Sequence, residues 1–167
     1  MEASIGEVLV SILVQFEIGE FAYTERKPTR HKPVNLSEVP LIEKASEWGI
    51  QIKTVPRMCK CHGHYDRNLY EIHLVTVDAK SYLHGLAHAA IERYRDPAVP
   101  FKPQSEEIIA ELAAAALYQI VTQKPDKWLS NSYAFILLNS VALNMTPLDA
   151  CLQVFAEAEE IIELILG

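Results

Sequence analysis

Two histidines four residues apart, His84 and His88, are the residues of this chain whose type and spacing point most directly to chemistry. On a helix, positions i and i+4 lie on one face about one turn apart, so both imidazoles can reach a single divalent ion. Taken alone, the same spacing is also common among ordinary surface or core histidines. A zinc site needs a third protein ligand and, for catalysis, an open coordination position. The pair therefore predicts part of a metal site whose remaining ligand comes from another element.

The residue after the first histidine departs from a known zinc motif. The stretch His84-Gly85-Leu86-Ala87-His88 has both histidines of the H-E-x-x-H pattern, in which the glutamate normally takes a proton from the attacking water. Gly85 has no side chain, so the base is missing from its usual position and the catalytic residue is unknown. Glycine inside a helix costs ~1 kcal/mol relative to alanine. Its presence indicates either that the protein tolerates this loss of stability or that another element packs closely on the helix backbone.

Candidate third ligands lie on the next expected helix, for which Ser105 is the predicted N-cap. Glu107 and Glu111 are four residues apart on one face of that helix, so one can bind a metal while the other orients a ligand histidine. If the metal ligand precedes the orienting acid in the sequence, Glu107 is the ligand; Glu111 is the alternative. Glu106 is expected to face solvent, where an acid in the first turn interacts favourably with the helix dipole.

Four stretches of the chain resemble the zincin-like metallopeptidase domain of ArdC-type antirestriction proteins and, more distantly, the IrrE/ImmA-type minimal zincins. They are residues 65–74, 84–89, 105–117 and 132–158, and the likeness covers roughly residues 60–167. The resemblance implies an α+β fold of the zincin-like (minimal gluzincin) type, with a small antiparallel sheet packed on a mostly helical core. It also implies a zinc ion held by His84, His88 and either Glu107 or Glu111. Gly85 replaces the catalytic glutamate of the family motif.

Two functions from different classes are compatible with these residues. In the first, the protein is a catalytically impaired zincin-fold module that binds metal or stays metal-free, and it recognises a peptide or protein partner without cutting it. In the second, it is an active zinc-dependent metallopeptidase with a non-standard base such as Glu106 or Glu111, or with no base at all. General-base help is typically worth ~100- to 10,000-fold, so an enzyme without it would be slow. The resemblance alone also implies an ArdC-like antirestriction or DNA-associated role.

A second group of metal-binding side chains occurs at Cys59-Lys60-Cys61-His62-Gly63-His64, because thiolate and imidazole ligands suit zinc. Its C-x-C spacing stands alone, whereas structural zinc sites commonly combine two knuckles with C-x2-C or longer spacing. We interpret the stretch as the end of a hairpin near the expected substrate cleft. There His62, His64 or Tyr65 would contact substrate or supply a fourth ligand to the metal. By the same resemblance, residues 65–73 form one wall of that cleft, where an extended peptide would bind by adding a strand.

Periodicity and capping residues predict the elements that hold these side chains. A single domain is expected over residues 1–167, divided into an N-terminal element (1–23), a basic linker (24–35) and a core (36–167). Helices are expected at residues 36–48, 78–95, from 105 onwards, 127–143 and 146–166, and at residues 5–18, where a strand is the alternative. Asp78 and Thr146 are the predicted N-caps of two of these helices. The helix at 78–95 is expected to bury an apolar stripe formed by Leu83, Leu86, Ala87, Ala90 and Ile91. Strands are expected at residues 50–55, 65–69 and 70–74, with a turn at 66–68. The aromatic and aliphatic residues predicted to form the C-terminal core are Tyr133, Phe135, Ile136, Leu137, Leu152, Phe155 and Ile162.

Composition indicates a folded cytoplasmic protein. Of the 167 residues, 50% are hydrophobic, and the three cysteines are too few and too unevenly placed for a disulfide framework. No apolar run is long enough to cross a bilayer, so no membrane contact is expected. The net charge of -7 argues against tight nonspecific binding of nucleic acid, although residues 24–67 hold nine Lys and Arg against five Asp and Glu. A peptide or protein is the expected partner.

Overall fold

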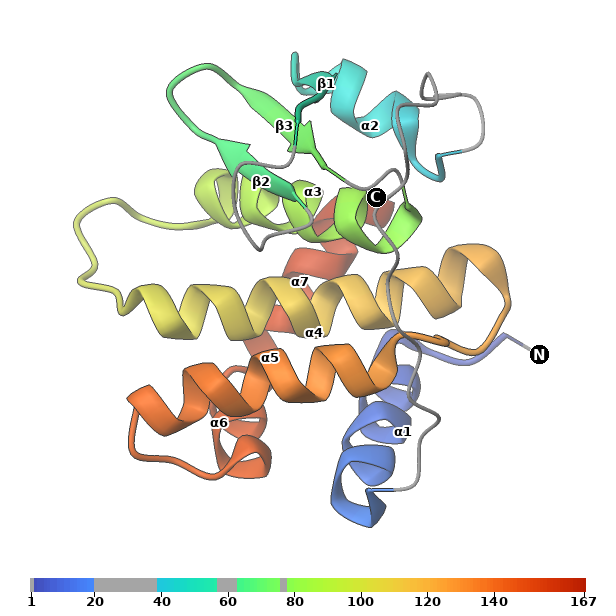
Figure 1. Ribbon diagram of the computed structural model, residues 1–167, viewed down its shortest axis with the longest axis vertical. Helices are drawn as coiled ribbons and strands as arrows, with labels where there is room; N and C mark the ends of the chain where they lie inside the picture. Colours follow the sequence, from blue (N-terminus) through green and yellow to red (C-terminus); the bar gives the residue numbers. More distant parts are fainter. Residues whose placement is uncertain (1, 20–38, 57–62, 76–77) are drawn as a thin grey trace.

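The computed structural model describes residues 2–19, 39–56, 63–75 and 78–167. Within these ranges the chain forms an α+β fold of seven helices and one small sheet of three strands (Figure 1). The helices are α1 (Ile5–Ile18), α2 (Ile42–Glu47), α3 (Ala79–Tyr94), α4 (Pro103–Thr122), α5 (Leu129–Ala142), α6 (Pro147–Gln153) and α7 (Phe155–Leu166). The strands are β1 (Gln51–Thr54), β2 (Gly63–Asp66) and β3 (Glu71–Leu74).

The sheet is mixed rather than antiparallel. Its strand order is β1-β3-β2, with β3 parallel to β1 and antiparallel to β2. The hairpin between β2 and β3 is closed by the Asp66 side chain, which accepts hydrogen bonds from the backbone N–H groups of Asn68 and Leu69. The expected antiparallel pairing is therefore correct for β2 and β3 but wrong for β1. Alternation of apolar and polar residues identifies a strand, but it does not encode the direction of its partner.

Helix α3 lies between the sheet and α4 (Figure 1). The Asp78 side chain accepts a hydrogen bond from the backbone N–H of Ser81, which confirms the predicted N-cap. The predicted apolar stripe of α3 is also buried; its members are Leu83, Leu86, Ala87, Ala90 and Ile91. The short helix α2 is joined to α3 at both ends, because Tyr82 donates to the Leu41 carbonyl and Arg93 donates to the Trp48 carbonyl.

Helix α4 crosses the centre of the molecule, and its alanine-rich middle is completely buried. The small side chains of residues 113–116 allow α3 and α5 to pack closely on either side of it. The helix begins at Pro103 with Lys102 as its N-cap, so the predicted cap at Ser105 is wrong. Proline favours the first turn because its missing N–H has no helical partner there.

The C-terminal third contains one more helix than expected. Thr146 caps α6 as predicted, but the helix breaks at Val154 and continues as α7. Ile136 and Ile162 are buried as expected, whereas Leu137 and Leu152 are exposed, so the prediction that both belong to the core is wrong. The N-terminal helix α1 has the predicted bounds and packs on α4 and α7.

In the described part of the chain, no single helix combines the length and apolar character needed to cross a bilayer, although α5 and α6 together, bent by 84°, would meet both requirements.

Candidate metal centre

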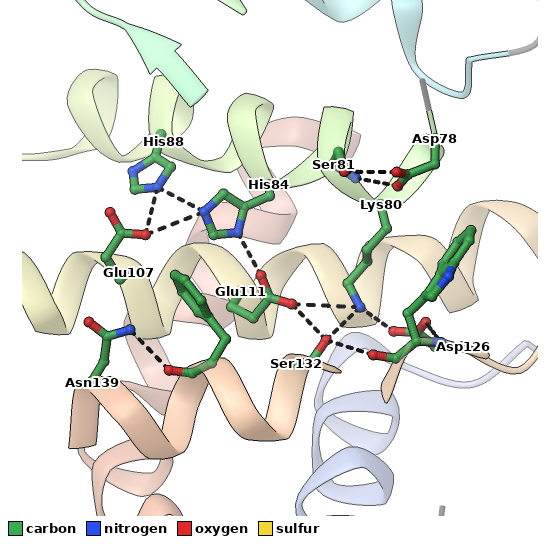
Figure 2. A network of polar contacts seen from close by, with 12 residues as sticks. Asp78, Lys80, Ser81, His84, His88, Glu107, Glu111, Asp126, Ser132 and Asn139 are labelled. Carbon is green, nitrogen blue, oxygen red and sulfur yellow. Dashed lines mark hydrogen bonds and ion pairs between the residues drawn. The ribbon is translucent and has the colours of Figure 1, made fainter. Parts of the chain in front are cut away.

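Three side chains from two helices converge between α3 and α4 (Figure 2). His84 and His88 come from adjacent turns of α3, and Glu107 comes from the first turns of α4. The two histidine Nε2 atoms are 3.1 Å apart. Oε2 of Glu107 lies 3.4 Å from Nε2 of His84 and 3.3 Å from Nε2 of His88. The three atoms therefore form a nearly equilateral triangle.

The dimensions of this triangle fit one tetrahedral metal ion. Ligands at zinc distances of ~2.0–2.1 Å lie about 3.3–3.4 Å from each other in a tetrahedral arrangement. The observed edges of 3.1, 3.3 and 3.4 Å need almost no adjustment to reach that value. Two imidazoles and one carboxylate are also a ligand set that zinc uses when a fourth position stays open. The Glu107 side chain is 37% exposed, so the site is open to solvent on the side of α4.

The second ring nitrogen of each histidine faces its own carboxylate. Nδ1 of His84 lies 2.7 Å from Oε2 of Glu111, and Nδ1 of His88 lies 2.8 Å from Oε1 of Glu106. A carboxylate in this position keeps the proton on Nδ1, which leaves the Nε2 lone pair for a metal. Glu107 thus has the position of a ligand, and Glu111 has that of the acid that orients a ligand histidine.

Glu106 is the acid whose role was missed from sequence. Its side chain is only 14% exposed, and besides His88 it contacts Arg67 of the hairpin turn and Arg95 at the end of α3. The prediction that it faces solvent is therefore wrong. Its partners are distant in sequence, so the favourable interaction of an acid with the helix dipole was the only local signal available.

The electrostatics of the cluster favour a cation at its centre. Burial by itself would lower the pKa of His84, but the carboxylates of Glu107 and Glu111 outweigh burial and raise that pKa to about 9. Burial would raise the pKa of Glu107, yet hydrogen bonds from both histidines lower it to about 2. Burial alone would also raise the pKa of Glu111, but His84 and Lys80 outweigh it and hold that pKa far below its usual range. The acids are therefore ionised at neutral pH.

Behind His84, a buried polar network continues away from the triangle (Figure 2). Ser132 of α5 donates to Oε1 of Glu111 at 2.6 Å, and the ammonium of Lys80 donates to Ser132 at 2.7 Å and also to Asp126. Lys80 is 1% exposed, so its charge is satisfied entirely within the protein. Lys80 precedes His84 by one helical turn, and this spacing was the available sequence signal for its place on the same face.

Together, four carboxyl groups and three cationic side chains surround the two histidines, and the raised pKa of His84 means that this histidine supplies a fourth positive charge at neutral pH. The acids are Glu106, Glu107, Glu111 and Asp126, and the cations are Arg67, Lys80 and Arg95.

Gly85 is required by the packing of α3 on the sheet. A Cβ atom at this position would lie 2.9 Å from Cγ2 of Ile72 and 3.3 Å from its Cγ1. Ile72 belongs to β3 and is completely buried, so a side chain at position 85 would enter the interface between sheet and helix. Of the two explanations considered for this glycine, close approach is the one the structure supports. A glutamate at this position would require the Ile72 side chain to move.

The remaining predicted site residues are placed as follows. Tyr65 of β2 points towards α3, where its hydroxyl donates to Glu92 at 2.7 Å. His64 is on the opposite face of β2 and contacts His73 of β3, with 3.1 Å between the nearest ring nitrogens. His62 lies outside the described residues, as do both cysteines of the C-x-C stretch. Cys151 is completely buried in α6. Phe135 of α5 packs edge-on against the His84 ring.

The chain matches no family model, no curated protein and no solved structure, so the character of this site rests on its own geometry.

Proposed function

We propose that this protein is a zinc-binding module of degenerate zincin type, in which His84, His88 and Glu107 hold the ion and no peptide bond is cut. The observation that carries the proposal is the triangle of ligand atoms with edges of 3.1–3.4 Å. Zinc bound there would supply a Lewis acid with an open position. The protein's own residues orient the two imidazoles and neutralise the surrounding charge.

Among the described residues, the two acids next to the triangle are both engaged by other groups, which supports the non-hydrolytic role. Position 85 is closed to a side chain by Ile72. Both alternative acids are occupied, because Glu106 accepts from His88 and pairs with two arginines, and Glu111 accepts from His84 and Ser132. A carboxylate engaged in several charge-assisted hydrogen bonds is a poor proton acceptor, since each bond stabilises its ionised form.

A polypeptide is the partner that the proposal favours. A zinc ion with an open position coordinates a carboxylate, imidazole or thiolate from another chain as readily as it coordinates water. The exposed side of Glu107 leaves room for such a group. A role in cutting peptides, or an antirestriction role on DNA, would require features beyond this site.

Metal content is the experiment that tests the proposal. The untagged protein, loaded with zinc and dialysed, is expected to retain one zinc per chain by elemental analysis. His84→Ala and Glu107→Gln are each expected to lose it. Glu92→Gln, which removes an acid of α3 that is paired with Tyr65, serves as the matched control and should retain the ion. Retention of zinc by both ligand variants, or its absence from the native protein, would refute the site. Zinc together with measurable peptide hydrolysis would refute only the non-hydrolytic role.

A further inference from the structure

A second pair of histidines lies on the outer face of the sheet. His64 of β2 and His73 of β3 are direct partners in the register, and Nε2 of His64 lies 3.1 Å from Nδ1 of His73. The neighbouring pair, Tyr65 and Ile72, points towards α3, where Ile72 packs against Gly85. Because successive side chains of a strand point to opposite faces, the two imidazoles lie on the face that is turned away from α3.

The second ring nitrogen of His73 faces an acid. Nε2 of His73 lies 2.7 Å from Oε2 of Glu71, which is two residues earlier on the same face of β3. The Glu71 side chain is only 10% exposed, and the ammonium of Lys53 from β1 donates to its other oxygen. The hydrogen bonds from His73 and from Lys53 lower the pKa of Glu71. An ionised carboxylate at Nε2 keeps the proton of His73 on that nitrogen, so the Nδ1 lone pair faces His64.

The distance between the two facing nitrogens fits two ligands of one metal ion. Before an ion binds, the Nε2–H group of His64 donates to Nδ1 of His73. When an ion binds, both nitrogens coordinate it and the His64 proton moves to Nδ1 of its own ring. Two nitrogen ligands at ~2.0–2.1 Å from an ion lie about 2.9 Å apart at a right angle and about 3.3–3.4 Å apart at the tetrahedral angle. The observed 3.1 Å falls between these values.

Ligand type and local charge indicate the class of ion. Imidazole nitrogens suit divalent transition metals such as nickel, copper and zinc, whereas calcium and magnesium take oxygen ligands. The carboxylates of Glu71 and Asp66 are partners in the register, and one ammonium, that of Lys53, pairs with Glu71. Two acids against one ammonium give this face a net negative charge, which favours a cation.

We propose that His64 and His73 form a second metal site, which binds a divalent transition-metal ion such as Ni(II) with water in its other positions and so joins β2 to β3. In the described part of the chain, two side chains supply the ligands. The ion should therefore bind more weakly than one in the triangle and should be lost on dialysis. The site shares no residue with the triangle, so it is independent of the proposed function.

Titration with Ni(II), followed by isothermal titration calorimetry, tests this site. His84→Ala, in which the triangle has lost a ligand, is expected to bind one equivalent of Ni(II) per chain, and so is the zinc-loaded native protein. His64→Ala or His73→Ala, added to either protein, should abolish this binding. Glu71→Gln should weaken it about 10- to 100-fold, because the carboxylate that keeps the His73 proton on Nε2 is lost. Circular dichroism checks that each variant is folded.

Asp66→Asn is the matched control, since it removes a carboxylate from the same face and keeps the oxygen that closes the hairpin turn. It should change the affinity by no more than about threefold, because a charge near solvent is screened. Cys59 and Cys61 precede β2 in the sequence, and thiolates also bind transition metals. Cys59→Ser combined with Cys61→Ser is therefore a second control, and it should retain the ion.

Three results would overturn the proposal. The first is that neither His84→Ala nor the zinc-loaded native protein binds Ni(II). The second is an affinity that His64→Ala and His73→Ala leave unchanged. The third is loss of binding in the cysteine variant with retention in the histidine variants, which would assign the ion to the thiolates. Failure of the triangle to bind zinc would leave the expected result for His84→Ala unchanged, so the two metal sites are tested separately.

Discussion

At the scale of single residues, each histidine of the candidate site is oriented by an acid that faces its Nδ1 atom. Nδ1 of His84 faces the buried Glu111, and Nδ1 of His88 faces Glu106, which two arginines hold in place. The direction of each ring is therefore set before a metal arrives. Preorganisation of this kind lowers the cost of ordering ligands on binding and so raises affinity.

We predict that Glu111→Gln and Glu106→Gln each weaken zinc binding by about 10- to 100-fold without abolishing it. Glutamine keeps the length of the side chain and an oxygen for the Nδ1 proton, but it loses the charge that strengthens the hydrogen bond. Competition with a chromogenic zinc chelator measures the effect, with Glu92→Gln as the control. An unchanged affinity in both variants would mean that packing alone, including Phe135 against His84, orients the rings.

At the scale of elements, the close packing of α3 on β3 positions the candidate site. Gly85 allows the helix to lie directly on Ile72, and that contact sets the height of His84 and His88 relative to the sheet. The motif glutamate and this close packing exclude each other. The glycine at the position of the motif glutamate is thus tied to how the helix packs on β3.

We predict that Gly85→Ala destabilises the protein although alanine favours helix. The gain in helix propensity is ~1 kcal/mol, whereas forcing a Cβ against the buried, β-branched Ile72 costs ~1–3 kcal/mol. The same substitution made in an Ile72→Ala background should be neutral or stabilising, and chemical denaturation of the four proteins gives the coupling energy.

Gly6→Ala in α1 is the matched control for this cycle. A Cβ atom there would meet only the mobile end of the Glu159 side chain at 3.0 Å. We expect this variant to be as stable as the native protein or slightly more stable. Additivity of Gly85→Ala and Ile72→Ala would contradict the steric explanation of the glycine.

At the scale of the whole molecule, what could be predicted from sequence divides by the range of the interactions. The bounds of α1, the Asp78 cap and the shared face of His84 and His88 depend on residues within one or two turns, and they were predicted. The direction of β1, the contacts of Glu106 with Arg67, and the burial of Lys80 against Asp126 join residues far apart in sequence. Periodicity holds no information about such pairs.

The candidate ligands lie on α3 and α4, which pack against each other in the core of the fold, so a metal bound there should stabilise the entire molecule. An ion that binds only the folded state at a hundred times its Kd adds about 2.7 kcal/mol to the free energy of unfolding. For a domain of this size, that corresponds to an increase in Tm of about 5–10 °C. We therefore expect zinc to raise Tm and a chelator to reverse the increase, as followed by circular dichroism. His84→Ala should unfold at the same temperature with and without zinc. An equal response to zinc in that variant would place the stabilising ion elsewhere in the chain, because His84 supplies one of the three atoms of the triangle.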